Sequence, residues 1–337
     1  MHISKYRIAL DAMGGDFAPL NEIEGTYLLL NDPHHQDVEV HLIGNQDQIE
    51  KQIKSLNYDL NKVKIIHASD QITMKDDPTD VIKKRRNSSL YIGAEYHAQG
   101  NCDAFASAGN TGAMLAVSTM VLGRIKGVSR PSIGTVLPTI KGNPVFLMDV
   151  GATVDLKPRY LYEYAVMGSI YLEKVLNITT PRVGLLNVGE EESKGTEAVK
   201  ETYHLLKSSK LNFVGNVEGR DIMYGDFDLV ICDGFVGNIV LKFAESFLSV
   251  LKSKIKDYSE KSLVNKLKTG LMVPIMKEVL LDFDYQNYGG VALLGVNGVS
   301  IIGHGKSSPL AIKNMLLRAK DMIKADVNKI IENALIN

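Results

Sequence analysis

Short polar loops follow several apolar segments of this chain, and their small residues suit the binding of an anion. The clearest is Ser107-Ala108-Gly109-Asn110-Thr111-Gly112, which lies between apolar runs at 102–106 and 113–122. A strand passing into a helix through such a turn directs unpaired amides and the positive end of the helix dipole at one point. Taken alone, the stretch is explained at least as well by a tight connection needing glycine for positive φ or close packing.

The same pattern recurs along the chain, which favours a site over a chance turn. Strand-like runs end in Asp11-Ala12-Met13-Gly14-Gly15-Asp16, in Asp149-Val150-Gly151-Ala152, in Asn187-Val188-Gly189 and in Asp233-Gly234-Phe235-Val236-Gly237-Asn238. Ligands of open α/β sheets bind outside the carboxyl ends of the strands. We therefore expect these loops to meet at one sheet edge, in a polar cleft for a small anion and the group attached to it.

Composition narrows the class of protein. The 337 residues are 45% hydrophobic and 23% charged with a formal net charge of −1, which is typical of a soluble protein with a substantial core. The sequence has no basic stripe interleaved with aromatic residues, so it gives no argument for nucleic-acid binding. The two cysteines, Cys102 and Cys232, lie in apolar runs, so a reducing cytoplasm is expected. No signal peptide and no bilayer-spanning run is expected.

Alternating strand and helix patterns position these loops. Strands are predicted at 6–10, 38–43, 63–66, 133–137, 145–150 and 229–232, with helices between them and a long closing helix over 309–331. This alternation predicts a layered α/β fold. The length suits one large domain or two moderate ones.

Two groups of cations have competing interpretations. Lys83-Lys84-Arg85-Arg86 follow a helix start at Asp77-Pro78, and such a run is most often a solvated helix face, although it also suits docking of an acidic partner or a phosphate. Lys194 is the only cation in an acidic turn after the strand ending at Asn187. A surface ion pair with a neighbouring glutamate and a catalytic role have similar weight for it.

Residues 243–282 interrupt the α/β pattern and predict a helical hairpin. Phe243, Phe247 and Leu251 fall at helical spacing, and residues 252–268 carry six lysines against one Asp and one Glu, a net of 6 − 2 = +4. An apolar tip, Leu271-Met272-Val273, follows Lys266 and Lys268. Such a basic hairpin can lie on an anionic membrane surface, pack in a dimer interface, or do both.

Several familiar sites are absent from the sequence. It contains no P-loop, no dinucleotide fingerprint after the first strand, no nucleophile elbow and no metal-type Cys/His spacing. Cys232 has no histidine near it in sequence and is expected to be a core residue. His304 between two glycines suits an acid/base role and a turn equally, and Ser308 before Pro309 suits a helix cap.

Taken in order, the motifs resemble the bacterial phosphate acyltransferase family, PlsX. The resemblance rests on the loops quoted above and on Lys84-Arg85-Arg86-Asn87-Ser88-Ser89, Gly123-Arg124-Ile125-Lys126-Gly127 and Tyr288-Gly289-Gly290. It covers nearly the whole chain. Each motif is weak alone, but this many in one order is highly specific.

The resemblance implies transfer of a long acyl chain from acyl carrier protein to inorganic phosphate, for phospholipid synthesis. It implies a cytoplasmic, peripherally membrane-associated homodimer, with the glycerol-3-phosphate acyltransferase as a further partner. Its fold would be a single three-layer α/β/α domain over 1–337, with a mixed sheet and intertwined lobes, like isocitrate and isopropylmalate dehydrogenases and phosphotransacetylases. The family's catalytic Lys and Asn fall on Lys194 and Asn238. Gly303-His304-Gly305-Lys306 departs from the family's Ala-His-Gly-Ser-like pattern, which leaves the role of Lys306 open.

Elementary chemistry is consistent with that reaction without a cofactor or metal. Phosphate is a competent nucleophile near neutral pH, so positioning matters more than a strong base. The amides of Ser107–Gly112, with the side chains of Asn110 and Thr111, are expected to hold it. Lys194 and Asn238 are suitable donors to the tetrahedral oxyanion, an effect on the order of 3–4 kcal/mol per donor. Asp11, Gly14, Gly15, Asp16, Ser107, Gly109, Gly112, Asn187, Asp233, Gly237 and His304 complete the expected phosphate and substrate contacts.

Three rival functions remain at this level. One is a short-chain phosphotransacylase that uses coenzyme A, and another is a decarboxylating dehydrogenase, which lacks its metal-binding aspartates here. The third is a membrane-attached scaffold for lipid enzymes. Docking of the acidic carrier protein is assigned to Lys84, Arg85 and Arg86 or to the lysines of 252–268, with the two left as alternatives.

Overall fold

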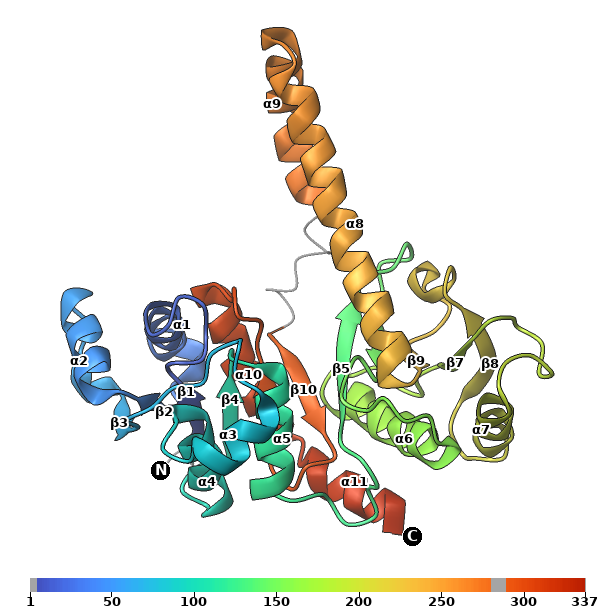
Figure 1. Ribbon diagram of the computed structural model, residues 1–337, viewed down its shortest axis with the longest axis horizontal. Coiled ribbons are helices and arrows are strands. Elements are labelled where there is room, and N and C mark those ends of the chain that lie inside the picture. The colour runs from blue at the N-terminus through green and yellow to red at the C-terminus, as the bar shows by residue number, and fades with distance from the viewer. Residues whose placement is uncertain (1–4, 280–288, 337) are drawn as a thin grey trace.

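The protein is described by a computed structural model that covers residues 5–279 and 289–336 (Figure 1). Its strands are β1 (Tyr6–Asp11), β2 (Val38–Gly44), β3 (Lys64–His67), β4 (Ala104–Ser107), β5 (Ser132–Leu137), β6 (Val145–Met148), β7 (Val183–Asn187), β8 (Phe213–Glu218), β9 (Leu229–Ile231), β10 (Val291–Leu294) and β11 (Val299–Ile302). The predicted strands are all present, while β8 and β10 were not expected from the sequence.

Eleven α-helices lie in the described ranges. They are α1 (Leu20–Leu30), α2 (Gln46–Ser55), α3 (Pro78–Lys84), α4 (Ser89–Ala98), α5 (Thr111–Val121), α6 (Pro158–Lys174), α7 (Glu197–Lys207), α8 (Gly234–Glu260), α9 (Leu263–Val279), α10 (Pro309–Lys324) and α11 (Val327–Ile336). The expected single closing helix is wrong, because Asp326 adopts φ of 50° and separates α10 from α11. Side-chain caps from Asp77, Ser88, Asn110, Thr196, Asp233 and Ser308 begin six of these helices.

All strands form one sheet, in the order β3-β2-β1-β4-β11-β10-β5-β6-β9-β7-β8. Most neighbours are parallel, but β10 pairs antiparallel with β11 and with β5, and β5 pairs antiparallel with β6. The predicted mixed sheet is therefore confirmed. Short apolar strands such as Val145–Met148 are buried along their whole length, as expected for a sheet covered on both faces.

Alternate residues of each strand enter two different cores, because side chains of a strand point to opposite faces. Ile8 and Leu10 of β1 join one core, and Ala9 joins the other. Likewise Phe146 and Leu147 of β6 are divided between them. Helices α1, α6, α10 and α11 contribute to the first core, and α4 and α5 to the second. The result is a three-layer α/β/α arrangement.

Strand direction overturns the expectation of a single sheet edge. Three antiparallel pairings lie between β11 and β6, so β6, β7 and β9 run opposite to β1, β4 and β11. The loops after these two groups of strands begin at opposite ends of their strands. Sheet twist of about 20–25° per strand then rotates one group relative to the other. The candidate residues accordingly form two clusters instead of one.

Helices α8 and α9 pack against one another and project from the body of the molecule (Figure 1). The predicted excursion started at residue 243, but α8 is continuous from Gly234, since Asp233 caps it directly after β9. The predicted end at 282 lies outside the described residues. By length and composition α8 is also able to cross a membrane, which the sequence inspection did not anticipate.

Candidate active site

The first cluster joins the loops that follow β1, β4 and β11. A Cβ on Gly14 would lie 2.9 Å from the backbone nitrogen of Gly109, and the Cα of Gly14 lies 3.2 Å from the Cβ position of Gly109. The amide of Asp16 donates to the carbonyl of Gly305, and that of Gly303 to the carbonyl of Ser107. These glycines are required for close approach of the three loops, and neither Gly109 nor Gly112 has a positive φ.

The amino end of α5 provides the backbone donors of this cluster. The amides of Thr111 and Gly112 have no acceptor within the described chain, as is usual for the first turn of a helix. The helix dipole adds positive potential at the same point. This geometry suits the predicted anion contact at 107–112.

The side chains of this cluster are more occupied than the sequence predicted. The side-chain oxygen of Asn110 caps α5 by accepting from the amide of Ala113. Its side-chain nitrogen donates to the backbone carbonyls of Thr73 and Asp76. Ser107 is fully buried and donates to Asp11, which is itself 1% exposed. These bonds give Asn110, Ser107 and Asp11 a role in shaping the loops, and their phosphate contacts stay a prediction. Among the described residues the exposed Thr111 hydroxyl makes no hydrogen bond, so it and the backbone amides are the available donors.

A buried carboxyl that the sequence did not single out supports this cluster. Glu22 of α1 is 1% exposed, lies against Gly15, and its Oε2 has no hydrogen-bond partner. Burial, with the nearby charge of Asp11, raises the pKa of Glu22 to about 8. A glutamate in the first turn of a helix is ordinarily exposed, so no sequence signal identified it.

Replacing Glu22 tests its protonation directly. A carboxyl whose pKa is raised in the folded state contributes stability that is fully present below pH 4.5, its ordinary pKa. This contribution is lost as the pH rises through about 8. Glu22→Gln stays neutral, so its stability relative to wild type is expected to improve by roughly 2–3 kcal/mol between pH 6 and pH 9. Chemical denaturation at both pH values measures the change, and Glu24→Gln on the same helix is the control. A pH-independent difference would contradict the assignment.

The second cluster is organised by Asp149 after β6. Its buried carboxylate accepts from the amides of Gly151 (3.0 Å), Ala152 (2.8 Å) and Thr153 (2.8 Å). Burial raises the pKa of Asp149 to about 6 despite these bonds. Asp149 lies in one of the loop motifs quoted above. Its position directly after an apolar strand is the sequence feature that indicates a structural role.

The loop held by Asp149 packs on the first turn of α8. The amide of Gly234 donates to the carbonyl of Thr153, and a Cβ on Gly237 would lie 1.8 Å from the carbonyl oxygen of Asp149. The carboxamide carbon of Asn238 lies 3.6 Å from the Cβ position of Gly151. Asn238 is thus positioned beside the Asp149 loop. Asp233 is used as the cap of α8, accepting from Val236.

Lys194 lies on the loop that follows β7, two strands from β6. The Asn187 side chain accepts from the amide of Val188 and donates to the carbonyl of Lys194, which closes this loop. The Lys194 ammonium is exposed and makes no ion pair with any described residue, because Glu192 pairs with Lys207 instead. The alternative of a lysine paired with its neighbouring glutamate is therefore wrong.

A groove lies between α5, whose amino end belongs to the first cluster, and the loop held by Asp149 in the second. It encloses ≈ 420 Å³ and is lined by α5, by Arg130 and Pro131, and by the segment Ala152–Asp155 that follows Gly151. Its α5 wall begins at Leu115, one turn after Thr111. The amides of Thr111 and Gly112 lie one turn from this wall along α5, and Asn238 lies against Gly151, the residue before Ala152, although none of the three lines the groove itself.

Other candidates are placed in structural roles. The thiol of Cys232 is buried, donates to the carbonyl of Asp149, and has a pKa raised by burial, as expected for an inert core cysteine. The ring of His304 accepts from the amide of Lys306 in the turn before α10. The side chain of Ser308 caps α10 through Ala311, as predicted.

The basic run at 83–86 is only partly on a helix. Helix α3 ends at Lys84, and the Arg85 guanidinium binds Asp70 (2.8 Å) and Asp76 (3.3 Å), which lowers the pKa of Asp70. Arg85 is therefore committed to its own chain. Lys84 has an exposed pairing with Asp80, and Arg86 lies over the ring of Tyr91, so these two are better available to a partner.

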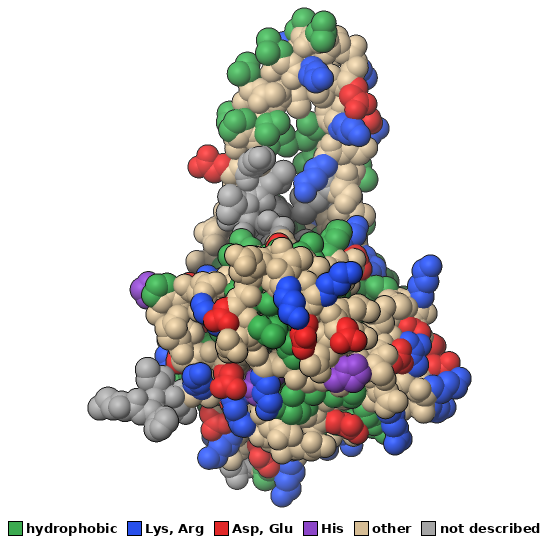
Figure 2. Space-filling model, turned by 90° about the vertical axis from the view of Figure 1, so that its left-hand side faces the viewer, with side chains coloured by type: hydrophobic (Ala, Val, Ile, Leu, Met, Phe, Trp, Pro, Cys, Tyr) green, Lys and Arg blue, Asp and Glu red, His purple; other side chains and the backbone are tan. Residues whose placement is uncertain are grey.

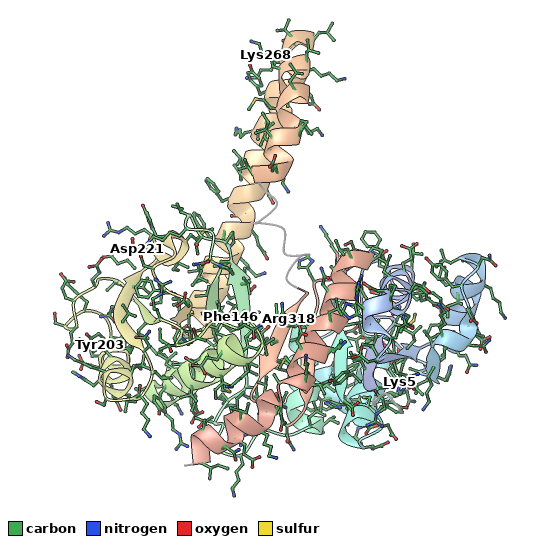
Figure 3. The ribbon with its side chains drawn as sticks, turned by 180° about the vertical axis from the view of Figure 1, so that it is seen from behind. Lys5, Phe146, Tyr203, Asp221, Lys268 and Arg318 are labelled. Carbon is green, nitrogen blue, oxygen red and sulfur yellow. The ribbon has the colours of Figure 1, made fainter. Side chains whose placement is uncertain are left out.

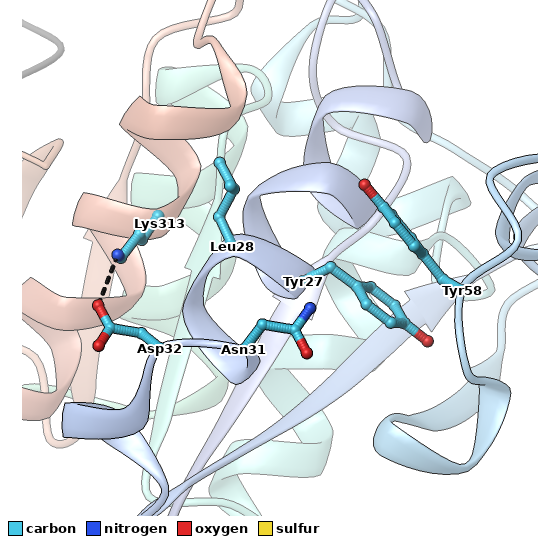
Figure 4. A pocket seen from close by; sticks show the side chains of 6 residues that line it. All are labelled: Tyr27, Leu28, Asn31, Asp32, Tyr58 and Lys313. Carbon is cyan, nitrogen blue, oxygen red and sulfur yellow. Dashed lines mark hydrogen bonds and ion pairs between the residues drawn. The ribbon is translucent and has the colours of Figure 1, made fainter.

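A second hollow lies between α1 and α10, away from both clusters (Figure 4). It encloses ≈ 260 Å³, and its charged side chains Lys313 and Asp32 pair with one another at 2.8 Å. Its Tyr27 ring stacks on Tyr58, and the Tyr27 hydroxyl donates to the carbonyl of Asp59. With these polar groups satisfied, the hollow offers little to a ligand. Across the described ranges, no three His, Cys, Asp or Glu side chains gather as a metal site.

Comparison with known proteins identifies the family. A model of the family described as fatty acid synthesis protein matches residues 6–330. The chain belongs to this family. A phosphate acyltransferase of Heliobacterium modesticaldum is 46% identical over 319 residues, covering 94% of each chain. A phosphate acyltransferase of Thermoanaerobacterium thermosaccharolyticum is 43% identical over 321 residues, covering 95% of this chain and 94% of its own.

The family fold is similar to that of a solved phosphotransacetylase. The enzyme from Streptococcus pyogenes superposes with a TM-score of 0.65 at 15% identity, covering 96% of this chain and 94% of its own. At this identity the likeness concerns the fold alone. It confirms the predicted α/β fold with a mixed sheet, which this chain shares with phosphotransacetylase.

Proposed function

We propose that this protein is an acyltransferase that moves a fatty acyl group onto inorganic phosphate, forming an acyl phosphate for phospholipid synthesis. The family match over 6–330 and relatives named phosphate acyltransferase at more than 40% identity support this function. The observation that carries it within the molecule is an exposed Lys194, without an ion pair to any described residue, on the loop after β7, the strand next to β9, which leads into the helix that carries Asn238. The long-chain donor is proposed to be acyl carrier protein.

The two clusters have different roles in the proposed reaction. The free amides of Thr111 and Gly112 hold phosphate at the amino end of α5. One phosphate oxygen attacks the thioester carbon, and the Lys194 ammonium and the Asn238 amide stabilise the oxyanion that develops. The C–S bond then breaks, and the thiolate leaves readily because thiols have a pKa of about 8.5. Asp11, Ser107, Asn187 and Asp149 position the loops without touching the reacting atoms.

The test of this function is phosphate-dependent consumption of palmitoyl-acyl carrier protein. Acyl phosphate is trapped with hydroxylamine, which converts it to a hydroxamate. Product that requires both phosphate and the enzyme is expected. Absence of product with any acyl donor, from folded protein, would favour the membrane scaffold instead. Product from acetyl-coenzyme A alone would favour the short-chain phosphotransacylase, whose fold the chain shares.

The fold is further proposed to share its ancestry with isocitrate and isopropylmalate dehydrogenases. The three-layer arrangement and mixed sheet support this classification. A dehydrogenase activity is not part of the proposal. Absence of nicotinamide reduction with decarboxylating 2-hydroxy acids is the expected result.

We also propose that α9 contacts an anionic membrane surface from the cytoplasm. Its apolar side chains Leu263, Leu267, Leu271 and Ile275 recur every fourth residue and are 64–86% exposed. Lys266 and Lys268 flank this stripe, and Figure 3 labels Lys268 near the free end of the projecting pair. Figure 2 shows hydrophobic side chains interspersed with basic ones on this projection. Amphipathic basic helices of this kind bind in the plane of the interface.

Flotation with anionic vesicles tests the membrane contact. Leu267→Glu combined with Leu271→Glu is expected to abolish co-flotation, because each charge would enter the acyl region. Val214→Glu changes a 52% exposed apolar residue of β8 on the body and should float like wild type. Equal flotation of both variants would contradict a role for α9. The predicted apolar tip at 271–273 is wrong in its position, because the free end is the turn between Glu260 and Leu263; Met272 and Val273 lie in the middle of α9, are 55% and 42% exposed and belong to the proposed contact.

The exposed apolar stripe of α8 supports a homodimer. Ile239, Phe243 and Phe247 are 53–71% exposed at a spacing of four residues. Light scattering is expected to give twice the chain mass for wild type and the single mass for Phe243→Glu. Because the first turn of α8 is packed on the Asp149 loop, we propose that this helix lies on a partner or membrane surface and does not span the bilayer.

Carrier-protein docking is proposed for the basic surface of Lys84 and Arg86, with the lysines of 252–268 as the alternative. Lys84→Glu with Arg86→Glu is expected to raise KM for acyl carrier protein without lowering kcat. An unchanged KM would shift docking to the α8–α9 lysines. Binding of the glycerol-3-phosphate acyltransferase stays a prediction, tested by co-flotation of the two proteins.

A further inference from the structure

Helix α5 exposes an uncharged face. Ala113, Met114, Val117 and Ser118 are buried in the core below it. The accessible positions are Leu115, Ala116, Thr119 and Met120, and the last is 50% exposed. The solvent face of a helix is normally polar or charged. Helix α5 contains no charged residue, so its accessible face is apolar and borders the groove described above.

The opposite wall of the groove is partly apolar. Ala152 and Val154 face this space with Pro131, and Val154 is 74% exposed. Only two lining residues, Arg130 and Asp155, are charged. The volume of ≈ 420 Å³ between these walls is within the range of sites that bind small ligands.

The hydroxyl groups of the lining are already bonded within the chain. The Thr119 hydroxyl donates to the carbonyl of Leu115 at 2.7 Å. The Thr153 hydroxyl accepts from the phenol of Tyr164 at 3.0 Å, and its amide and carbonyl bind Asp149 and Gly234. The threonines therefore have few polar atoms to spare for a ligand. An amide-rich ligand would bury polar groups without partners at this wall, at considerable cost.

The groove lies where a thioester donor needs it. Ala152 directly follows Gly151, which lies against Asn238. Leu115 is one turn from the free amides of Thr111 and Gly112 on the same helix. A chain in the groove would thus have its carbonyl end beside Asn238 and the phosphate position nearby.

We propose that the groove between α5 and 152–155 binds the fatty acyl chain of the donor. This inference rests on the proposed phosphate acyltransferase function and adds the subsite that recognises the chain. Each buried methylene contributes about 0.8 kcal/mol, so the groove favours long chains over short ones. The pantetheine arm, which carries amides, lies outside it.

The test fills the groove and compares donors that differ only in chain length. Ala116→Trp is expected to lower kcat/KM for palmitoyl-acyl carrier protein at least tenfold and to leave butyryl-acyl carrier protein within about twofold. Retained butyryl turnover shows that the variant is folded. Leu205→Trp, an accessible apolar position on α7, is the control and should change neither value. Thr119→Lys, which charges the same face, should reproduce the selective loss.

The outcomes separate this inference from the function beneath it. An equal loss of kcat/KM for both donors would mean that the groove binds the pantetheine arm that they share. No loss for either donor would mean that the groove does not bind the donor. Both outcomes overturn the inference and leave the proposed function in place. Should wild type form no acyl phosphate at all, the function fails, and titration with the fluorescent fatty acid cis-parinarate still decides the groove. A dissociation constant at least tenfold weaker in Ala116→Trp supports it, and equal binding or none by wild type overturns it.

Discussion

Lys194→Ala is expected to lower kcat about 10²–10³-fold, because it removes one donor to the oxyanion. Thermal stability should stay within about 0.5 kcal/mol of wild type, since the side chain is exposed and has no ion-pair partner among the described residues. The hydroxylamine assay gives kcat, and a thermal melt gives stability. Loss of activity without loss of stability is the signature of a catalytic group.

The matched control is Lys210→Ala. Lys210 is an exposed lysine in the turn before β8. Because β7 and β8 are parallel, this turn lies at the opposite end of the two strands from the Lys194 loop, which follows β7. Its removal changes the net charge by the same amount and should leave kcat unchanged. A Lys194→Ala enzyme that turns over like the Lys210→Ala enzyme would remove Lys194 from the mechanism.

Gly237→Ala is expected to cost 1–3 kcal/mol of stability, with activity falling as well, because overpacking forces the backbone to move. The added Cβ would lie 1.8 Å from the carbonyl oxygen of Asp149 and 2.8 Å from the Cys232 sulfur. Neither is the end of a flexible side chain. Relief of the clash must shift the start of α8, and Asn238 is the next residue along it.

Gly270→Ala is the control for this substitution. It lies inside α9 with no atom within 4 Å of its Cβ position, so alanine should be neutral or stabilise that helix by up to about 1 kcal/mol. Denaturant unfolding of both variants, with kcat of each, measures the contrast. Wild-type stability in Gly237→Ala would mean that the Asp149 loop does not hold α8 as described.

Local pattern was sufficient for most elements and for the chemistry of the site. Apolar runs such as 145–148, followed by Asp and Gly, predicted strands that end in polar loops, and the cap at Asn110 follows from residue types within one turn. Strands β8 and β10 were not predicted, and β8 is partly exposed, so it lacks the continuous apolar run that indicated the other strands. Glu22 was not found, because a glutamate in the first turn of a helix is ordinarily exposed and only the packing of the Gly15 loop against it buries this carboxyl.

The sequence by itself determined which loops are rich in glycine and carboxylates, which lysine stands alone in an acidic turn, and the family to which the chain belongs. Those features depend on short-range propensity and on residue identity. Only the tertiary structure decided how the loops are grouped, because strand direction follows from pairing between distant segments, and an odd number of antiparallel pairs reverses β6, β7 and β9. It also turned Asn110, Asp11 and Arg85 toward their own chain, left Lys194 unpaired, and placed the apolar face of α5 opposite 152–155. Each depends on neighbours that are remote in sequence.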